Sequence, residues 1–494
     1  MKKIEHDAGS FRDNAGSIFY FENKVLRILE TEGEKRINFL LEKKLLDNPE
    51  IDKYLISSKI TKDYDSQINN SKKKIVIEHS KIPYISYPYE WSFEQLKDAA
   101  IHHLDFHLFL LNNDANLIDA SAYNIQFNGT KPKFIDILSI KKYVEGEFWA
   151  AHKQFCENFL NPLILKSKKG IDFNNWFKGN LEGIKTSDIY SMLNIYDFFS
   201  MNILTNVILM NYFDQKALKK ENINVDKFKN KKLPKNTFIS ILRNLKKFIS
   251  KLKAKKGKTV WDNYSISNTY NSDEEKKKRE LVKDFVSKNK FNVLADIGCN
   301  DGVYSKLSLE SGCRYVVGFD YDLNCVQNAY IKAKNENLNF LPLYFDATNP
   351  SVNLGWNEAE RKGFKTRAKF DAVIALAFEH IIQDEPDRFY DIYDGPTILD
   401  HRTTISSNNY AVKVMNEECA FGISINTHID RSECGFGEKK CYTYTFYTNH
   451  NTLEFTESFG DCMSGWTSAT FGSFEISPGD CTDELDNPDT HDSI

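Results

Sequence analysis

The chain is 494 residues long, enough for roughly two or three domains with a sizeable buried core. Hydrophobic residues make up 41% of it and charged residues 27%, a composition that excludes a disordered or fibrous protein. The net charge of −4 hides a division, because residues 383–494 hold 21 acidic and 6 basic side chains whereas residues 1–382 hold 48 and 59. A boundary is therefore expected near residue 383.

The amino terminus and the apolar segments favour a cytoplasmic protein. Its first lysines are not followed by an apolar run, so no cleaved secretory signal is expected. The longest apolar stretch, Phe198 to Phe213, is interrupted by polar residues and is shorter than the roughly 20 residues that span a bilayer. We interpret it as a buried helix. Cysteines in that compartment should be reduced thiols, and since their spacings contain no CxxC pair, no metal site is predicted.

The first 214 residues mix strands and helices and predict an α+β region. Alternating and helical hydrophobic periods give the expected elements. They are strands at Ser17–Phe21 and Lys24–Ile28, helices at Lys35–Leu46 and Phe93–Leu111, two short strands within 119–140, and a mostly helical stretch from Gly146 to about Asp214.

Residues 216–258 are the most biased part of the chain, with sixteen Lys or Arg against Glu221 and Asp226. Apolar residues from Phe238 to Leu252 recur at three and four positions, which predicts an amphipathic helix with a basic outer face. Such a segment can bind nucleic acid or an anionic membrane surface. A solvated helix in a linker over 215–260 is the interpretation we favour, because the segment separates two regions that carry motifs.

From Asn292 onward short apolar strands alternate with helices, which is typical of a parallel sheet. The strands are Val293–Ile297, Tyr315–Phe319, Asn339–Tyr344 and Phe370–Ala377, and the helices between the first three are Tyr304–Glu310 and Cys325–Asn335. The fold class is therefore α/β, with a Rossmann-like sheet.

Glycines and acidic residues follow three of these strands. The first strand runs into DIGCNDG, in which Gly298 and Gly302 permit a sharp turn and a close approach to a ligand. Asp320 ends the second strand, where a carboxylate can accept hydrogen bonds from ribose hydroxyls, and Asp346 follows the third. Turn and acids at the same edge of a sheet favour nucleoside binding.

This combination resembles the class I S-adenosylmethionine-dependent methyltransferases. The resemblance implies S-adenosyl-L-methionine as cofactor, bound by Asp296, Gly298, Asn300, Gly302, Asp320 and Asp346. The three-glycine motif of NAD-binding folds is absent, so methyl transfer is favoured over hydride transfer. His380, after the fourth strand, is a candidate general base, and its alternative role is to hydrogen-bond a loop.

A second constellation lies in the amino-terminal half. Asp119 and Asn124 have the D-x-x-x-x-N spacing of kinase-like phosphotransferases, and Asp136 follows the next strand. In such enzymes these residues orient an acceptor hydroxyl and hold magnesium against nucleotide phosphates. The preceding His and Arg and a glycine-rich phosphate loop are missing, and Arg27 only roughly replaces the lysine. We therefore interpret a degenerate kinase-like module, with an ATP- and magnesium-dependent phosphotransferase as the alternative.

Longer blocks carry a more specific resemblance. They are EWSFEQLKDAA, DASAYNIQF, DIGCNDGVYS and FDAVIALAFEH, beginning at residues 90, 119, 296 and 370. With them the chain resembles a bacterial family of methyltransferases related to a rhizobial nodulation-associated protein. The resemblance implies a kinase-like region joined to a methyltransferase domain. It identifies no methyl acceptor, so a small molecule, a glycan and a protein group all stay open.

The family pattern stops after the fourth strand, where residues 383–494 begin. Members of the family continue with further strands that close the sheet, so we expect a sheet that is cut short or completed by an unrelated extension. This acidic tail alternates like antiparallel strands at Tyr410–Met415, Gly422–Thr427, Cys441–Thr448 and Thr452–Thr456. The predicted domains are 1–214, 215–260, 261–382 and 383–494. A third function stays open, a non-enzymatic interaction protein with two degenerate modules.

Overall fold

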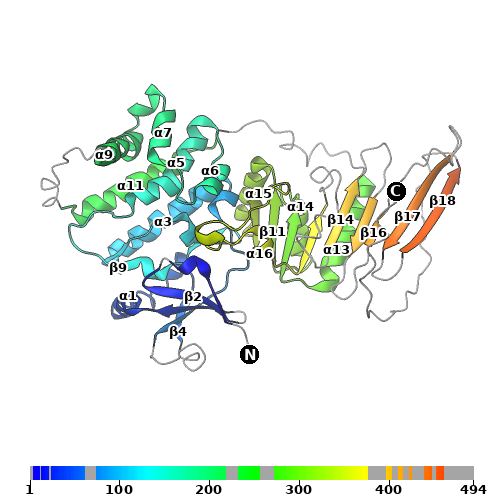
Figure 1. Ribbon diagram of the computed structural model, residues 1–494, viewed down its shortest axis with the longest axis horizontal. Helices are drawn as coiled ribbons and strands as arrows, with labels where there is room; N and C mark the ends of the chain where they lie inside the picture. The colour runs from blue at the N-terminus through cyan, green and yellow to red at the C-terminus, as the bar shows by residue number, and fades with distance from the viewer. Residues whose placement is uncertain are drawn as a thin grey trace. The chain divides into compact units, whose positions relative to one another are not determined.

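A computed structural model describes residues 4–11, 13–21, 24–61, 74–218, 232–255 and 272–376, and five strands between 397 and 460. By its internal contacts the chain divides into two compact units, whose elements are labelled in Figure 1. The first unit comprises Met1–Val293 and Asn300–Lys369, and the second comprises Leu294–Cys299 and Phe370–Ile494. The domain boundaries expected from the sequence stay a prediction.

The first unit begins with a five-stranded antiparallel sheet. Its strands are β1 (Ile4–His6), β2 (Gly16–Phe21), β3 (Lys24–Leu29), β4 (Ser58–Thr61) and β5 (Val76–His79), in the order β1-β2-β3-β5-β4. Leu26, Ile28 and Val76 form a buried cluster on this sheet with Phe21. The predicted strands Ser17–Phe21 and Lys24–Ile28 correspond to β2 and β3, and β3 is buried at four consecutive positions from Leu26 to Leu29.

The first helix, α1, runs over Thr31–Glu42 and not over the expected Lys35–Leu46. Its earlier start places Glu32 and Glu34 in the first turn, where negative charge favours a helix amino terminus. Lys44, just past its end, has a left-handed φ of 52°. The apolar period alone extended the predicted helix across this stop.

The long helix α3 (Phe93–Asn112) is the core of the first unit. Ser92 and Gln95 cap its start reciprocally, and its buried positions include Leu96, Leu104 and Leu110. The short elements around it are β6 (Ala115–Leu117), β7 (Ile125–Asn128), β8 (Lys131–Phe134) and β9 (Ile140–Lys142), in which β7 pairs with β8 and β6 with β9.

A helical block follows, and it contains three π-helical stretches. The helices are α4 (His152–Phe155), α5 (Asn161–Ile164), α6 (Asn174–Gly179), α7 (Thr186–Met192), α8 (Met201–Ile203) and α9 (Leu209–Leu218), and the π stretches are η6 (Cys156–Leu160), η7 (Leu165–Lys169) and η9 (Leu204–Ile208). The 3₁₀ turn η8 (Ile195–Phe199) precedes α8.

The interpretation of Phe198 to Phe213 as a single buried helix is wrong. The segment is divided among η8, α8, η9 and α9, and the side chains of Phe199 and Met201 are largely exposed. Asn206 bonds the backbone carbonyl of Asn202, a local contact of the kind that competes with regular helix geometry. High apolar content here did not imply burial.

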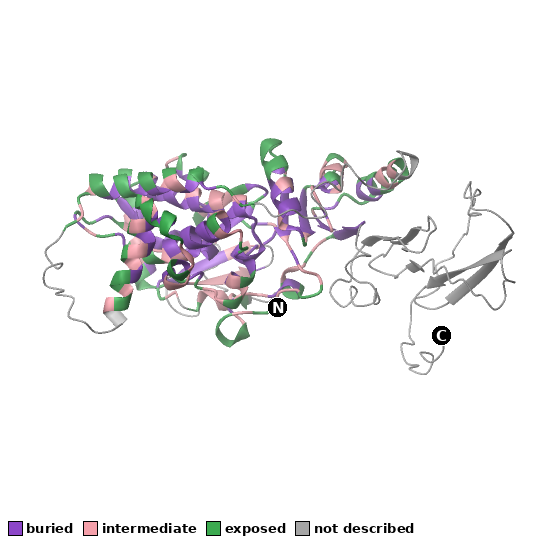
Figure 2. Cartoon of the chain, turned by 90° about the horizontal axis from the view of Figure 1, so that it is seen from above, coloured by how far each residue is buried: buried purple, intermediate pink, exposed green. Residues whose placement is uncertain are grey.

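The basic helix α11 (Lys235–Lys251) packs along α3. Its buried residues are Phe238, Ile239, Leu242, Leu245 and Ile249, which recur at the spacing that predicted the amphipathic helix. Its other positions include Lys235, Arg243, Lys246, Lys247 and Lys251 and no acidic residue. Figure 2 shows how buried residues gather between the elements while exposed residues lie on the outer helices.

The first unit also contains an α/β layer. It consists of α13 (Ser272–Asn289), α14 (Val303–Glu310), β11 (Tyr315–Asp320), α15 (Leu323–Asn335), β12 (Phe340–Tyr344), η10 (Trp356–Glu358) and α16 (Phe364–Arg367). The strands β11 and β12 pair in parallel, with Asp320 opposite Tyr344. The layer contacts α3 directly. Gln95 Nε2 of α3 donates a hydrogen bond of 2.9 Å to the carbonyl of Pro342 in β12.

The described residues of the second unit lie mainly in strands. Parallel pairs join β10 (Val293–Ile297) to β13 (Ala372–Ala375) and β13 to β14 (Thr397–Arg402), and β15 (Tyr410–Val414) runs antiparallel to β14. A separate antiparallel sheet contains β16 (Gly422–Ser424), β17 (Lys439–Tyr447) and β18 (Thr452–Gly460). These strands overlap the ranges expected from the alternation of the acidic tail.

Among the described residues, no helix has the length and apolar character needed to cross a bilayer. Cys156, Cys299, Cys313 and Cys325 are buried thiols.

Candidate functional site

The turn after β10 contains three left-handed residues. Gly298 has φ 75°, Asn300 has φ 48° and Gly302 has φ 86°. At Gly302 a Cβ atom would lie 2.5 Å from the ring of Phe340, so both the backbone and the space require glycine. The glycine pattern that predicted a tight turn thus has a physical cause. α14 begins directly after Gly302.

Asp320, at the carboxyl end of β11, holds this turn. One of its carboxylate oxygens accepts the backbone N–H of Asn300 at 2.8 Å, and the other accepts that of Asp322 at 2.8 Å. The structure therefore brings together two residues that the sequence assigned to one cofactor site. Burial raises the pKa of Asp320 to about 6, and the nearby charge of Asp322 acts in the same direction.

Asp322 is a second carboxylate at the same strand end. Its Oδ1 caps α15 by accepting the N–H of Asn324 at 2.8 Å. Its Oδ2 is buried and has no hydrogen-bond partner among the described residues. A buried carboxylate oxygen without a donor is costly unless a ligand supplies one, so a hydroxyl- or amine-bearing ligand fits here. In the sequence this acid stands two residues after Asp320, and nothing there distinguishes it from a surface residue.

Asp346 lies just beyond β12. Its Oδ1 accepts the backbone N–H of Thr348 at 3.0 Å and the Thr348 hydroxyl at 2.7 Å. The N–H of Phe345 donates to the carbonyl of Asp320 at 2.9 Å, which joins the ends of β11 and β12. Burial raises the pKa of Tyr344, the last residue of β12, to about 12.

The remaining residues predicted to bind the cofactor belong to the second unit. Asp296 is buried at 2% exposure on β10, where it lies opposite Ile374 of β13. Gly298 follows it in the turn. His380 lies outside the described residues, so its role as a base stays a prediction.

Asp119 and Asn124, which the sequence predicted as part of a kinase-like site, lie close together. Asp119 accepts the N–H of Ser121 at 2.7 Å and hydrogen bonds from the side chains of Asn124 and Gln154. Burial raises the pKa of Asp119, an effect that the hydrogen bond from Ser121 opposes. The D-x-x-x-x-N spacing therefore brings both side chains to one place.

Asp136 has a different environment. It forms an ion pair with Arg27 of β3 and accepts the hydroxyl of Ser139, and Arg27 also lies 3.6 Å from Asp13. Although burial acts against ionisation of Asp136, these partners, led by the charge of Arg27, hold its pKa below the ordinary value. The carboxylate that would hold magnesium in a phosphotransferase is neutralised by the chain itself.

Sequence reasoning missed the residues that position the Asp119 loop. Gln154 accepts the N–H of Ala120 at 2.8 Å, and Asn158, in the π stretch η6, accepts that of Ala122 at 3.0 Å. Polar residues in a helical period give no indication of such a role. The π-helical geometry, often found at functional sites, is visible only in three dimensions.

A buried ion pair links the amino-terminal region to α16. Arg367 and Glu90 have side chains that are 4% and 6% exposed, and the Arg367 guanidinium lies 4.4 Å from the ring centre of Tyr87. Lys362 donates its backbone N–H to the Tyr87 hydroxyl at 3.1 Å. The block EWSFEQLKDAA thus contributes a structural contact to the α/β layer.

No group of three or more His, Cys, Asp and Glu side chains that could hold a metal ion occurs within the part of the chain that the structure describes.

Comparison with known proteins identifies the family. The nodulation protein NoeA of Rhizobium meliloti (strain 1021) is 38% identical over 374 residues, covering 76% of this chain and 78% of NoeA. The chain belongs to the NoeA family. No family model matches it.

Solved structures that resemble parts of this NoeA-family chain include methyltransferases. An S-adenosylmethionine-dependent methyltransferase from Clostridium acetobutylicum is 15% identical over 40% of this chain and 77% of that one, with a TM-score of 0.22. The ribosomal protein L11 methylase from Lactobacillus delbrueckii subsp. bulgaricus is 13% identical over 26% of this chain and 61% of that one, with a TM-score of 0.20. At these TM-scores the function has to be argued from the residues of the chain itself.

Proposed function

We propose that this NoeA-family protein is an S-adenosylmethionine-dependent methyltransferase. One observation carries the proposal: Asp320, at the end of a parallel strand, hydrogen-bonds the backbone of the glycine turn that opens α14. A turn with left-handed residues and a strand-end acid is an arrangement that binds a nucleoside. The motif resemblance described above supports methyl transfer as the chemistry.

The charge of the site favours this cofactor over a dinucleotide. Asp320 and Asp322 place two carboxyl groups at one strand end, and Oδ2 of Asp322 has no donor among the described residues. Such oxygens suit ribose hydroxyls and a cationic ligand, whereas a pyrophosphate would be repelled by them. The residues present therefore fit S-adenosylmethionine.

In this proposal Asp320 accepts hydrogen bonds from the ribose hydroxyls and Asp346 contacts the adenine amino group. Asp296, Gly298, Asn300 and Gly302 form the turn around the rest of the ligand. When bound, the cofactor supplies a sulfonium methyl group to a nucleophilic acceptor. The task of the chain is to orient the two reactants in line, and His380 is the candidate to remove the acceptor's proton.

Phosphotransfer is the weaker alternative. Asp119 and Asn124 do lie together, but Asp136 is paired with Arg27 and bonded to Ser139, so its charge is already compensated. A magnesium ion there would have to displace an arginine from a buried site. This favours a binding or structural role for the amino-terminal region.

Calorimetric titration of the full chain with S-adenosylmethionine tests the proposal. We expect saturable binding that Asp320→Asn weakens, whereas Asp284→Asn, an exposed carboxylate on α13, serves as the matched control and leaves it unchanged. Absence of binding to the wild-type chain would refute the cofactor assignment. A parallel titration with ATP and magnesium examines the alternative, and Asp136→Asn would abolish any such binding.

A further inference from the structure

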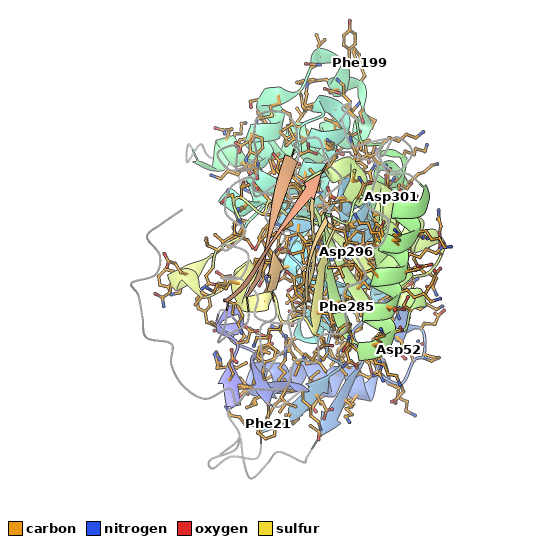
Figure 3. All side chains as sticks on the ribbon, turned by 90° about the vertical axis from the view of Figure 1, so that its right-hand side faces the viewer. Phe21, Asp52, Phe199, Phe285, Asp296 and Asp301 are labelled. Atoms are coloured by element: carbon orange, nitrogen blue, oxygen red, sulfur yellow. The ribbon has the colours of Figure 1, made fainter. Side chains whose placement is uncertain are left out.

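A protruding edge of the helical block carries large apolar side chains that no element covers. In η8 and α8, Ile195 is 73% exposed, Tyr196 82%, Phe199 81% and Met201 68%. Figure 3 shows the Phe199 side chain projecting outward from the end of this block. Exposed apolar side chains this close together mark an interaction surface. We call Ile195–Met201 the apolar edge.

The apolar edge presents no uncompensated negative charge. Its one acidic residue, Asp197, is 7% exposed and lies within 3.3 Å of Lys168 and 3.8 Å of Lys169. The carboxylate is thus turned inward and paired with two lysines. What remains at the surface of this edge is aromatic, aliphatic and thioether.

The helix α11 lies beside the apolar edge and is basic. A groove of about 660 Å³ is lined by Met201 and Thr205 on one side and by Ile241, Phe248, Lys247 and Lys251 of α11 on the other. No acidic residue occurs in α11. Arg243, Lys247 and Lys251 are exposed and form no ion pair with any residue that the structure describes. Met201 of the apolar edge and the cations Lys247 and Lys251 line the same groove, so the edge and α11 meet on one face.

We infer that this face docks on an anionic lipid bilayer. Aromatic and aliphatic side chains on a short turn enter the headgroup region, while lysines on an adjacent helix contact lipid phosphates. Amphipathic elements at membrane interfaces combine these two kinds of contact. A second copy of the chain would bring the same cations face to face and repel itself. RNA would use the cations but would leave Ile195 and Met201 exposed to water.

Vesicle co-sedimentation of the full chain tests this inference. The chain is mixed with vesicles of phosphatidylcholine alone or of phosphatidylcholine with phosphatidylglycerol. We expect pelleting with the anionic vesicles only, weakened by added salt. Either Lys247→Gln or Lys251→Gln should lower the partition coefficient onto anionic vesicles about fivefold. The double variant Tyr196→Ser with Phe199→Ser should lower it about tenfold or more.

Matched controls keep the test specific. Trp356→Ser removes an aromatic side chain that is 69% exposed on η10, and Lys53→Gln removes an exposed cation on a 3₁₀ turn at Ile51–Lys53. Both should pellet like the wild type. Since Tyr196 and Phe199 are exposed, their replacement should leave the circular dichroism spectrum and unfolding temperature unchanged.

Several results would overturn the inference. They are a wild-type chain that stays in the supernatant with both vesicles, edge variants that pellet as the wild type does, and a wild-type dimer that the edge variants convert to monomer with no change in vesicle binding. Binding of single-stranded RNA that Lys247→Gln abolishes, without vesicle binding, would assign the face to nucleic acid instead. None of these outcomes depends on S-adenosylmethionine binding.

Discussion

Asp320 and Asp136 are both largely buried carboxylates of the first unit, yet the charges around them differ in sign. Asp320 is bonded to backbone N–H groups and lies beside Asp322, and burial raises its pKa to about 6. Asp136 pairs with Arg27, and its pKa is lowered. No cation among the described residues compensates the charge of Asp320, whereas Arg27 compensates that of Asp136. Residue type alone does not decide whether a motif is functional.

The largest effect should come from breaking the Asp136 pair. Replacement Arg27→Met removes the cation that contacts both Asp13 and Asp136 and leaves the largely buried Asp136 carboxylate uncompensated. We expect the free energy of unfolding to fall by about 3–5 kcal/mol, measured by urea denaturation. Arg27→Lys keeps the charge and should lose less. A loss below about 1 kcal/mol, the range of an exposed pair, would contradict the structural role of this carboxylate.

Removing the charge of Asp320 should affect binding instead. Asp320→Asn is expected to weaken S-adenosylmethionine binding by about 10- to 100-fold, the range for a hydrogen bond to a charged acceptor. Since the pKa of Asp320 is about 6, the wild-type affinity should also fall as the pH drops below about 6, because the protonated carboxyl is a poorer acceptor. Calorimetry across that range measures both effects. A pH-independent affinity would argue against Asp320 as the ribose acceptor.

Two glycines with left-handed backbones, Gly302 and Gly312, can be compared in the same way. Gly302 and Gly312 both have left-handed φ angles, 86° and 109°, but only a Cβ at Gly302 would collide, with Phe340. Gly302→Ala should therefore cost about 1–3 kcal/mol more than Gly312→Ala, the usual penalty of overpacking. Unfolding midpoints measure the difference. Equal losses would mean that backbone strain alone requires glycine at this turn.

Buried histidines should make the protein less stable at acidic pH. Burial lowers the pKa of His107 to about 4 and that of His103 well below 6.5, and neither nitrogen of His103 has a partner within the described residues. Because the unfolded chain binds these protons first, stability should decrease as the pH falls from about 6.5 toward 4, by at most ~1.4 kcal/mol per pH unit for each histidine.

The variant His103→Leu should remove one of these contributions and flatten the loss of the unfolding midpoint with pH. His6→Asn, at an exposed position of β1, is the control. An unchanged pH profile for His103→Leu would show that other groups control the acid response.

Local hydrophobic periodicity was sufficient to predict much of the secondary structure of the α/β layer. The predicted strand Tyr315–Phe319 and helix Cys325–Asn335 differ from β11 and α15 only at their ends, since short apolar strands alternating with helices have few alternative folds. Apolar content was misleading at Phe198 to Phe213, where Phe199 and Met201 are among several apolar side chains exposed to solvent. Whether such a segment is buried depends on which other parts of the chain pack against it. The composition of the segment itself does not contain this information.

Two things about this protein were determined by the sequence itself: the glycine turn with its following acids, and the charge division near residue 383. Both follow from residue type and order. Only the tertiary structure decided which carboxylates are compensated, because Arg27 and Asp136 are far apart in the sequence and meet through the packing of β3 against a distant loop. It also showed that Met201 of the apolar edge and the basic helix α11 line one groove.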